Sequence, residues 1–312
     1  MASGGVEWLE CDVLSRIRWL RHAFSTRVLH RAGTGNVPLT GQDTSLATSL
    51  NLGYVEGERR TRIKENRQLF FDSLGVGTLA LAGLRQIHSS LVHQVRSEGV
   101  GLLHYNPSGC TPARVGSQNR LPSGDALLTD QPGILLSVQT ADCLPILLVD
   151  PARRAVAAVH AGWRGLLQRI AEKAVGEMQR AFHSRPEELR AAIGPSIRAC
   201  CYEVGQEVVE AYRGRFTRSE GYFTAPPAGD AANASRYPLL FLSARPPGQG
   251  PDGAAAARLD LVAVTRDQLQ NVGLRSRYIC VADFCTACRT DLFFSHRKEG
   301  LTGRMMAVVG VV

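Results

Sequence analysis

Cys143 and His160 are the residues whose type and position most directly suggest chemistry. Cys143 follows an apolar run over residues 134–138, and His160 ends another over residues 155–159. Both runs predict buried strands, so the two side chains should stand at the carboxyl ends of neighbouring strands, where they can converge in one pocket. This geometry suits a zinc site or a Cys/His nucleophile pair. A buried structural Cys and a core His are the alternative, which the pairing of the two residues disfavours.

The elements that would position these residues are short strands mixed with a few helices. We expect strands over residues 21–25, 79–87, 91–95, 126–129, 134–138, 146–149, 155–159, 189–193, 278–281 and 305–311. We expect helices over residues 56–74, 167–178, 204–212 and 260–271, the last with Asp260 as its N-cap. Clustered strands outnumber regular crossovers, which favours a layered α/β fold with mixed sheets. Residues 214–257, rich in Pro, Gly and Ala, predict an irregular insertion.

Composition narrows the class of protein. The chain has 312 residues, of which 44% are hydrophobic and 21% charged, as in ordinary globular proteins. Its net charge of +8 is carried almost entirely by Arg, spread along the chain without a basic block. That distribution does not indicate a nucleic-acid partner. Coding bias and a pocket for an anionic substrate explain it better.

The N-terminal residues and the cysteines bear on location. Residues 1–14 lack the basic start and apolar core of a secretory signal, and no window has the apolar length that spans a bilayer. The eight Cys are irregularly spaced, as expected for reduced thiols rather than a disulfide framework. We therefore expect a cytoplasmic protein with no membrane partner.

Four of the cysteines form two pairs that are close in sequence. Cys285 and Cys288 have the Cys-x-x-Cys spacing, which by itself suggests a redox or zinc site. No second pair stands at zinc-ribbon distance, so buried thiols are the expectation. Cys200 and Cys201 are interpreted in the same way, as packing residues.

Five motifs, taken together and in order, resemble a known family. They are Gln86-Ile87-His88, Thr140-Ala141-Asp142-Cys143-Leu144-Pro145, His160-Ala161-Gly162-Trp163-Arg164-Gly165, Gly194-Pro195-Ser196-Ile197 with Cys201-Tyr202-Glu203-Val204, and Asp291-Leu292-Phe293-Phe294-Ser295-His296-Arg297 with Thr302-Gly303-Arg304-Met305. This order resembles the YfiH family, once called the multicopper polyphenol oxidase (laccase) domain. The likeness runs from about residue 22 to residue 309.

The resemblance implies a single domain over residues 1–312, built as a four-layer α/β/β/α sandwich. It also implies a zinc ion bound by His88, Cys143 and His160. The activities it implies are phosphorolysis of purine nucleosides (adenosine, inosine, guanosine and methylthioadenosine) and deamination of adenosine, so purine nucleosides and phosphate are the expected small-molecule partners. The chain departs from the family pattern at Ser89, where Gly is usual, and in the loop after Arg27.

A zinc site with three protein ligands can take part in catalysis. Two His and one Cys leave the fourth tetrahedral position open, as in catalytic zinc sites, where a bound water has a pKa of about 7. Such a water can attack a purine at C6, as in zinc deaminases. In phosphorolysis the metal would instead orient phosphate or a ribose oxygen.

Five further residues are candidates for the site. Asp142 is a possible catalytic base or partner of the ligands, with a structural turn carboxylate as the alternative. Arg164 is expected to grip phosphate through its forked donors, and Arg27 and Arg304 are weaker candidates of the same kind. Gln86 could orient His88 or touch the substrate, or be a plain strand residue.

Three other functions compete with this one. A copper-dependent polyphenol oxidase (laccase) needs many His, commonly in His-x-His pairs, and the chain has eight His and no such pair. A Cys/His amidohydrolase acting on peptidoglycan precursors would use Cys143 as nucleophile and His160 as base. A binding or scaffold protein would leave an open metal position unexplained.

Overall fold

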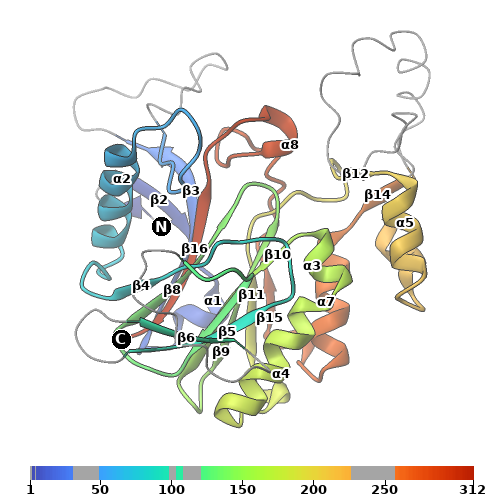
Figure 1. The fold of residues 1–312 in the computed structure, drawn as a ribbon, viewed down its shortest axis with the longest axis horizontal. Coiled ribbons are helices and arrows are strands. Elements are labelled where there is room, and N and C mark those ends of the chain that lie inside the picture. Colours follow the sequence, from blue (N-terminus) through green and yellow to red (C-terminus); the bar gives the residue numbers. More distant parts are fainter. Residues whose placement is uncertain (1, 4, 31–48, 98–102, 108–120, 226–256) are drawn as a thin grey trace.

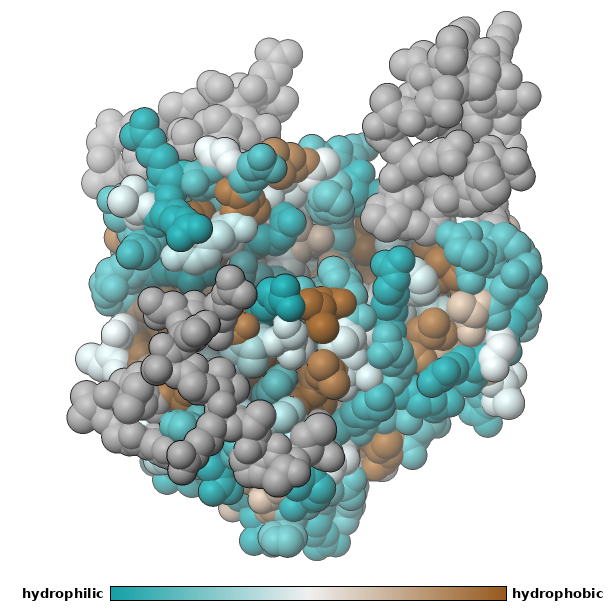
Figure 2. All heavy atoms as spheres, in the orientation of Figure 1, coloured by the Kyte–Doolittle hydropathy of each residue, from teal (hydrophilic) through white to brown (hydrophobic). Residues whose placement is uncertain are grey.

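Two β-sheets pack face to face, with helices on both outer sides (Figure 1). The structure is a computed structural model that describes residues 2–3, 5–30, 49–97, 103–107, 121–225 and 257–312. Within those residues no helix is long and apolar enough to cross a membrane. On the face drawn in Figure 2, hydrophilic residues predominate and hydrophobic ones are scattered among them.

The first sheet has six strands in the order β1-β2-β3-β16-β8-β4. They are β1 (Ala2–Ser3), β2 (Val6–Leu9), β3 (Leu20–Leu29), β16 (Met305–Val311), β8 (Ile134–Thr140) and β4 (Ala80–Ala82). Only the β4–β8 pair is parallel. The C-terminal strand β16 lies at the centre, where both neighbours satisfy its backbone.

The second sheet has seven strands in the order β15-β11-β9-β10-β7-β5-β6. They are β15 (Ile279–Val281), β11 (Arg190–Ile193), β9 (Leu144–Asp150), β10 (Ala155–Ala161), β7 (Ala126–Thr129), β5 (Val92–Ser97) and β6 (Leu103–Pro107). Parallel and antiparallel pairs mix here too. The central strands β9 and β10 are buried along their whole length, because both faces of this sheet are covered.

Helices cover the outer faces of both sheets. On one side α2 (Arg60–Ser73) packs Phe70 against the six-stranded sheet. On the other side α4 (Ile170–Phe182) and α7 (Leu261–Asn271) cover the seven-stranded sheet with their apolar stripes. A second core lies between the sheets, where Leu136 and Val309 meet Leu147 and Val156. The four layers confirm the predicted α/β/β/α sandwich with mixed sheets.

The remaining elements are short. They are α1 (Asp12–Ser15), α3 (Trp163–Leu167), α5 (Gln206–Arg213), α8 (His296–Glu299), the 3₁₀ turns η2 (Pro186–Glu188), η3 (Ser219–Tyr222) and η4 (Ser276–Tyr278), and the small sheet β12-β14-β13, formed by Glu203–Val204, Ala257–Leu259 and Phe223–Thr224. Both ends of the predicted 214–257 insertion are therefore regular. Residues 226–256 lie outside the described residues.

Most expected elements occur with shifted ends. The helix expected over residues 167–178 is α4, which begins only at Ile170, because Arg169 adopts a left-handed conformation (φ 62°) after the short helix α3. The strand expected over residues 79–87 is only Ala80–Ala82. The strand expected over residues 21–25 extends to Leu29. As predicted, Asp260 caps α7, accepting hydrogen bonds from the backbone N–H groups of Val262 and Ala263.

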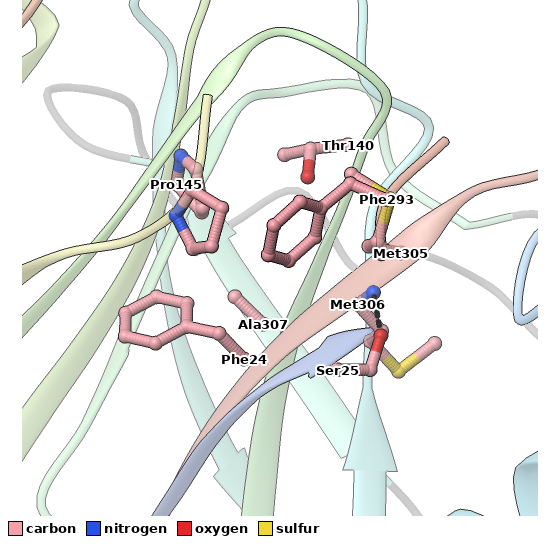
Figure 3. A pocket seen from close by; sticks show the side chains of 9 residues that line it. Phe24, Ser25, Thr140, Pro145, Phe293, Met305, Met306 and Ala307 are labelled. Atoms are coloured by element: carbon pink, nitrogen blue, oxygen red, sulfur yellow. Dashed lines mark hydrogen bonds between the residues drawn. The ribbon is translucent and has the colours of Figure 1, made fainter. Parts of the chain in front are cut away.

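The turn between β8 and β9 crosses from one sheet to the other and carries Cys143. Beside it, Thr140, Pro145 and Phe293 line a void of about 10 Å³ between the sheets (Figure 3). This void has room for about one water molecule. This crossing places Cys143 where the two sheets meet.

Candidate active site and metal centre

Three side chains from different parts of the chain meet at this sheet junction. His88 precedes β5, Cys143 lies on the β8–β9 turn, and His160 is the penultimate residue of β10. Their ligand atoms all lie within 4.8 Å of one another, and Cys143 Sγ is 3.7 Å from His88 Nε2. The structure thus brings together the three residues expected to bind metal.

Asp125, immediately before β7, holds two of these residues in place. Its fully buried carboxylate accepts a hydrogen bond from Nδ1 of His160 at 2.8 Å. It also accepts from the backbone N–H groups of Ile87, His88 and Ser89, and from the Ser89 hydroxyl at 2.6 Å. With Nδ1 of His160 engaged, its Nε2 is left for a metal, which is how ligating histidines are commonly oriented.

The Asp125 contacts also stabilise an unusual backbone. His88 has a φ of 57°, in the left-handed region that non-glycine residues rarely adopt. The three consecutive amides pointing at one carboxylate offset the cost of that conformation. Ser89, which departs from the family pattern, adds its hydroxyl to the same carboxylate.

The site favours charged forms of its members. Burial raises the pKa of the Cys143 thiol, but His160 and His88 outweigh burial and lower that pKa to about 6. Burial lowers the pKa of His160, but Cys143 and Asp125 outweigh it and raise the pKa to about 9. For Asp125, burial raises the pKa, while hydrogen bonds from His160 and Ser89 bring it to about 2. Cys143 is therefore a thiolate near neutral pH, the form that binds metals.

The donor set fits a tetrahedral metal ion. Two imidazole nitrogens and one thiolate are ordinary zinc ligands, and three protein ligands leave one position for a substrate or water. Gly162 leaves room beside them, since a Cβ there would lie 2.9 Å from Cδ2 of His88 and 3.1 Å from Sγ of Cys143. A side chain at residue 162 would displace two ligands.

A cavity of about 460 Å³ opens onto the three ligands. This volume is typical of small-molecule sites. Besides the ligands, its lining residues are Leu84, Gln86, Gln139, Thr140, Ala141, Asp142, Trp163, Arg164, Tyr202, His296, Arg297 and Arg304. Of the candidates named from the sequence, all but Arg27 line it.

Asp142 lines the cavity, but its carboxylate is occupied. One oxygen accepts from the hydroxyls of Thr286 (2.6 Å) and Ser295 (2.7 Å), and the other accepts from the backbone N–H of Arg297 (2.6 Å). Three donors from the segments around Thr286 and residues 295–297 therefore hold this carboxylate in place. The placement matches the structural turn carboxylate, not the catalytic base.

Arg27 lies away from the cavity, contrary to expectation. Because β3 continues to Leu29, Arg27 is part of a strand, with its side chain turned into the protein and only 5% exposed. Its guanidinium donates to Glu299 at 2.7 Å and to the carbonyl of Thr290 at 2.8 Å. It ties the segment of residues 290–299 to the sheet and does not reach a substrate in the cavity.

The other candidates differ in the hydrogen bonds that their side chains make within the protein. Arg164 is exposed, stacks its guanidinium 4.4 Å from the Trp163 ring centroid, and has no hydrogen bond or ion pair to any described residue. One terminal nitrogen of Arg304 donates to the carbonyls of Thr302 and Gly303. Gln86 pairs its amide with the backbone N–H and C=O of Gln139, both at 2.8 Å. Of these three side chains, that of Arg164 is thus the least engaged by other described residues.

Sequence reasoning missed Asp125, Tyr202 and Arg297 as parts of the site. Asp125 had one usable signal, its position directly before a fully apolar strand, where an acidic residue needs a buried partner. Tyr202 and Arg297 lie within the motifs, but the sequence by itself indicates no role for either residue. Arg297 packs its guanidinium 5.1 Å from the Tyr202 ring centroid.

Comparison with known proteins agrees with this architecture. A sequence profile of the family described as multi-copper polyphenol oxidoreductase laccase matches residues 35–312. Purine nucleoside phosphorylase YlmD of Geobacillus stearothermophilus is 33% identical over 274 residues, covering 86% of this chain and 86% of that protein. Adenosine deaminase RL5, from an unknown prokaryotic organism, is 33% identical over 254 residues, covering 81% of this chain and 83% of that protein.

A solved structure shows the same fold. The crystal structure of the hypothetical protein YfiH from Bacillus licheniformis superposes with a TM-score of 0.70 at 28% identity, covering 94% of this chain and 93% of that one. The chain therefore belongs to the multicopper polyphenol oxidoreductase (laccase) family, together with YfiH and YlmD.

Proposed function

We propose that the protein is a zinc-dependent purine nucleoside phosphorylase that also deaminates adenosine. The observation that carries this proposal is the cavity itself, in which an N₂S metal triad faces an unpaired Arg164 and two aromatic side chains. Relatives named for each of the two activities support it. His88, Cys143 and His160 would hold the zinc ion, which supplies a Lewis acid when bound.

The charge of the lining favours an anionic co-substrate. Three guanidinium groups, those of Arg164, Arg297 and Arg304, line the cavity. The only carboxylate among the lining residues is Asp142, whose oxygens are already engaged by three donors. Inorganic phosphate fits such a surface, and the free fork of Arg164 can bind two of its oxygens at once.

The aromatic residues suit the base of a nucleoside. Trp163 and Tyr202 line the same cavity, and each has a guanidinium against its ring, from Arg164 and Arg297 respectively. The attraction between ring and cation keeps positive charge beside each aromatic surface. A nucleoside whose purine stacked on one of these rings would place its ribose near inorganic phosphate bound by the Arg side chains.

The decisive experiment is product analysis. Purified protein is incubated with inosine or adenosine, with and without phosphate, and the products are separated. We expect hypoxanthine and ribose 1-phosphate from inosine only when phosphate is present, and inosine from adenosine without phosphate. If no free base appears from either nucleoside in phosphate, the proposed function is wrong.

A variant pair tests the role of Arg164. Arg164→Ala should raise the KM for phosphate at least tenfold and leave adenosine deamination nearly unchanged, because only phosphorolysis needs the phosphate grip. Arg164→Lys should restore phosphate binding only in part, since an ammonium group cannot make the two parallel hydrogen bonds of a guanidinium. Arg153→Ala, which removes an exposed Arg that does not line the cavity, is the control.

A second candidate, a Cys/His amidohydrolase, is favoured by one observation. Cys143, His160 and Asp125 stand in the order nucleophile, base and orienting carboxylate, with the His160–Asp125 hydrogen bond at 2.8 Å. The two functions differ in their response to metal removal. A chelator should abolish nucleoside turnover if zinc is required, whereas it should expose Cys143 and increase hydrolysis of an amide substrate if Cys143 is the nucleophile.

A further inference from the structure

A second cluster of metal-ligand side chains lies outside the cavity. Cys200, Cys201, Cys285 and Cys288 bring their four sulfur atoms within 4.8 Å of one another. The sulfur of Cys288 is 3.6 Å from that of Cys200 and 3.3 Å from that of Cys201. We propose that these four thiolates bind a structural zinc ion, separate from the ion proposed for the active site.

The distances fit a single ion. Four sulfur atoms about 2.3 Å from a tetrahedral zinc would be about 3.8 Å from one another. The observed separations need only small side-chain adjustments to reach that value. A disulfide needs an S–S bond of about 2.05 Å, well below the 3.3 and 3.6 Å that separate the sulfur of Cys288 from those of Cys201 and Cys200. An iron–sulfur cluster binds its Cys to different iron atoms, so it needs wider spacing.

Local backbone geometry allows two adjacent residues to point at one ion. On a strand, Cys200 and Cys201 would face opposite ways. Here they lie in a turn, in which the backbone N–H groups of Cys201 and Tyr202 both donate to the carbonyl of Arg198 at 2.9 Å. Both sulfurs can therefore face Cys288.

The second pair is shaped by its own turn. The backbone N–H of Arg289 donates to the carbonyl of Cys285 at 3.0 Å, closing a turn over the Cys-x-x-Cys segment. This turn places the sulfurs of Cys285 and Cys288 together, beside those of Cys200 and Cys201.

The cluster joins two segments that build one wall of the active-site cavity. Tyr202, next to Cys201, lines that cavity. Thr286, between the Cys285 and Cys288 ligands, donates its hydroxyl to Asp142, next to Cys143. Both segments are mainly turns, so a metal would supply rigidity that regular structure does not. Binding one Zn²⁺ to four thiols would form four Zn–S bonds and release four protons to solvent.

Metal content of purified protein tests the proposal. Compared with wild type, Cys285→Ser/Cys288→Ser and Cys143→Ala should each retain half of the zinc, and the triple variant should retain none. Cys280→Ser is the control, because it removes a partly buried thiol outside both clusters, and it should keep the full amount. Unchanged zinc in the double variant would overturn the Cys₄ site while leaving the proposed function intact. Unchanged zinc in Cys143→Ala would instead overturn the zinc dependence in the proposed function and leave the Cys₄ site intact.

Two measurements that leave all four thiols of the cluster in place cover the case in which the double variant does not fold. Cobalt(II) replacing zinc should give the intense thiolate-to-metal absorption of a tetrahedral site with four sulfurs, in Cys143→Ala as well as in wild type. Thiol counting after denaturation without reductant should find all eight Cys. Absence of the absorption in Cys143→Ala, or a shortfall of two thiols from a disulfide, would refute the proposal.

Discussion

Replacing Asp125 with Asn tests whether this carboxylate organises the metal site. The substitution keeps the shape of the side chain but turns one oxygen into an NH₂ group. One side of the carboxylate receives His160 Nδ1 and the His88 amide, and the other receives the amide and hydroxyl of Ser89. Whichever way the Asn amide is turned, its NH₂ group meets at least one backbone or imidazole donor that loses its acceptor.

The expected magnitudes follow from that mismatch. A buried donor left unsatisfied costs about 1–3 kcal/mol. The pKa of Asp125, lowered from 3.8 to about 2, corresponds to about 2 kcal/mol of stability in the metal-free protein. Because the folded-state pKa is the lower one, this stability is present above pH 3.8 and is lost as the pH falls toward 2. Loss of the partner of a ligating His should also weaken zinc binding about 10- to 100-fold.

The assay is zinc competition against a chromophoric chelator, together with urea unfolding of metal-free protein at neutral pH. Asp150→Asn is the matched control. Asp150 is equally buried, but one oxygen accepts from the backbone N–H groups of Ala152 and Arg153 and the other has no partner among the described residues. Asn can keep both bonds there, so zinc affinity should not change. Wild-type zinc affinity in Asp125→Asn, or an equal loss in Asp150→Asn, would refute the reasoning.

Three further predictions concern packing, reactivity and stability. Gly162→Ala should weaken zinc binding at least tenfold, because the new Cβ crowds Cys143, whereas Gly176→Ala, inside α4 with open space around it, should stabilise the protein by about 0.5–1 kcal/mol. In metal-free protein, peptide mass spectrometry should show alkylation of Cys143 rising to half its maximum near pH 6, since its thiolate forms above that pH. Arg27→Met should cost about 3 kcal/mol in urea unfolding by breaking the buried pair with Glu299, with no change in the KM for phosphate.

Each of these has an opposing outcome. Equal zinc affinity in the two Gly variants would show that the space beside the ligands is not needed. A half-maximum near pH 9 would show that His160 does not stabilise the thiolate. A raised KM for phosphate with unchanged stability would return Arg27 to the substrate site.

Much of the fold was predictable because its strands are buried on both faces. The runs that became β7, β8, β9, β10 and β16 are continuous and apolar, and short turn residues separate them. Asp260 was recognisable as a cap because its side-chain chemistry is local. In contrast, the extension of β3 to Leu29 depends on pairing with β2, which is not visible in the β3 sequence itself.

The site was harder to predict where it depends on distant contacts. Strand ends and family resemblance predicted that His88, Cys143 and His160 would meet, as they do. The partners of Asp142, however, are 144 to 155 residues away in sequence. The thiol cluster was missed for the same reason. Cys200 and Cys288 are 88 residues apart, too far for any spacing rule to connect them.

The segment of residues 86–89 has a mechanical consequence. The Gln86 side chain is fixed to Gln139 on β8 of the six-stranded sheet, and the following three amides are fixed to Asp125 beside β7 of the seven-stranded sheet. The position of His88 therefore depends on contacts to both sheets. Any sliding of one sheet over the other moves this ligand relative to His160. Metal affinity should consequently depend on the relative position of the two sheets. Substitutions in the core between the sheets, even far from the cavity, should alter metal affinity more than substitutions on the outer faces of α2 or α4.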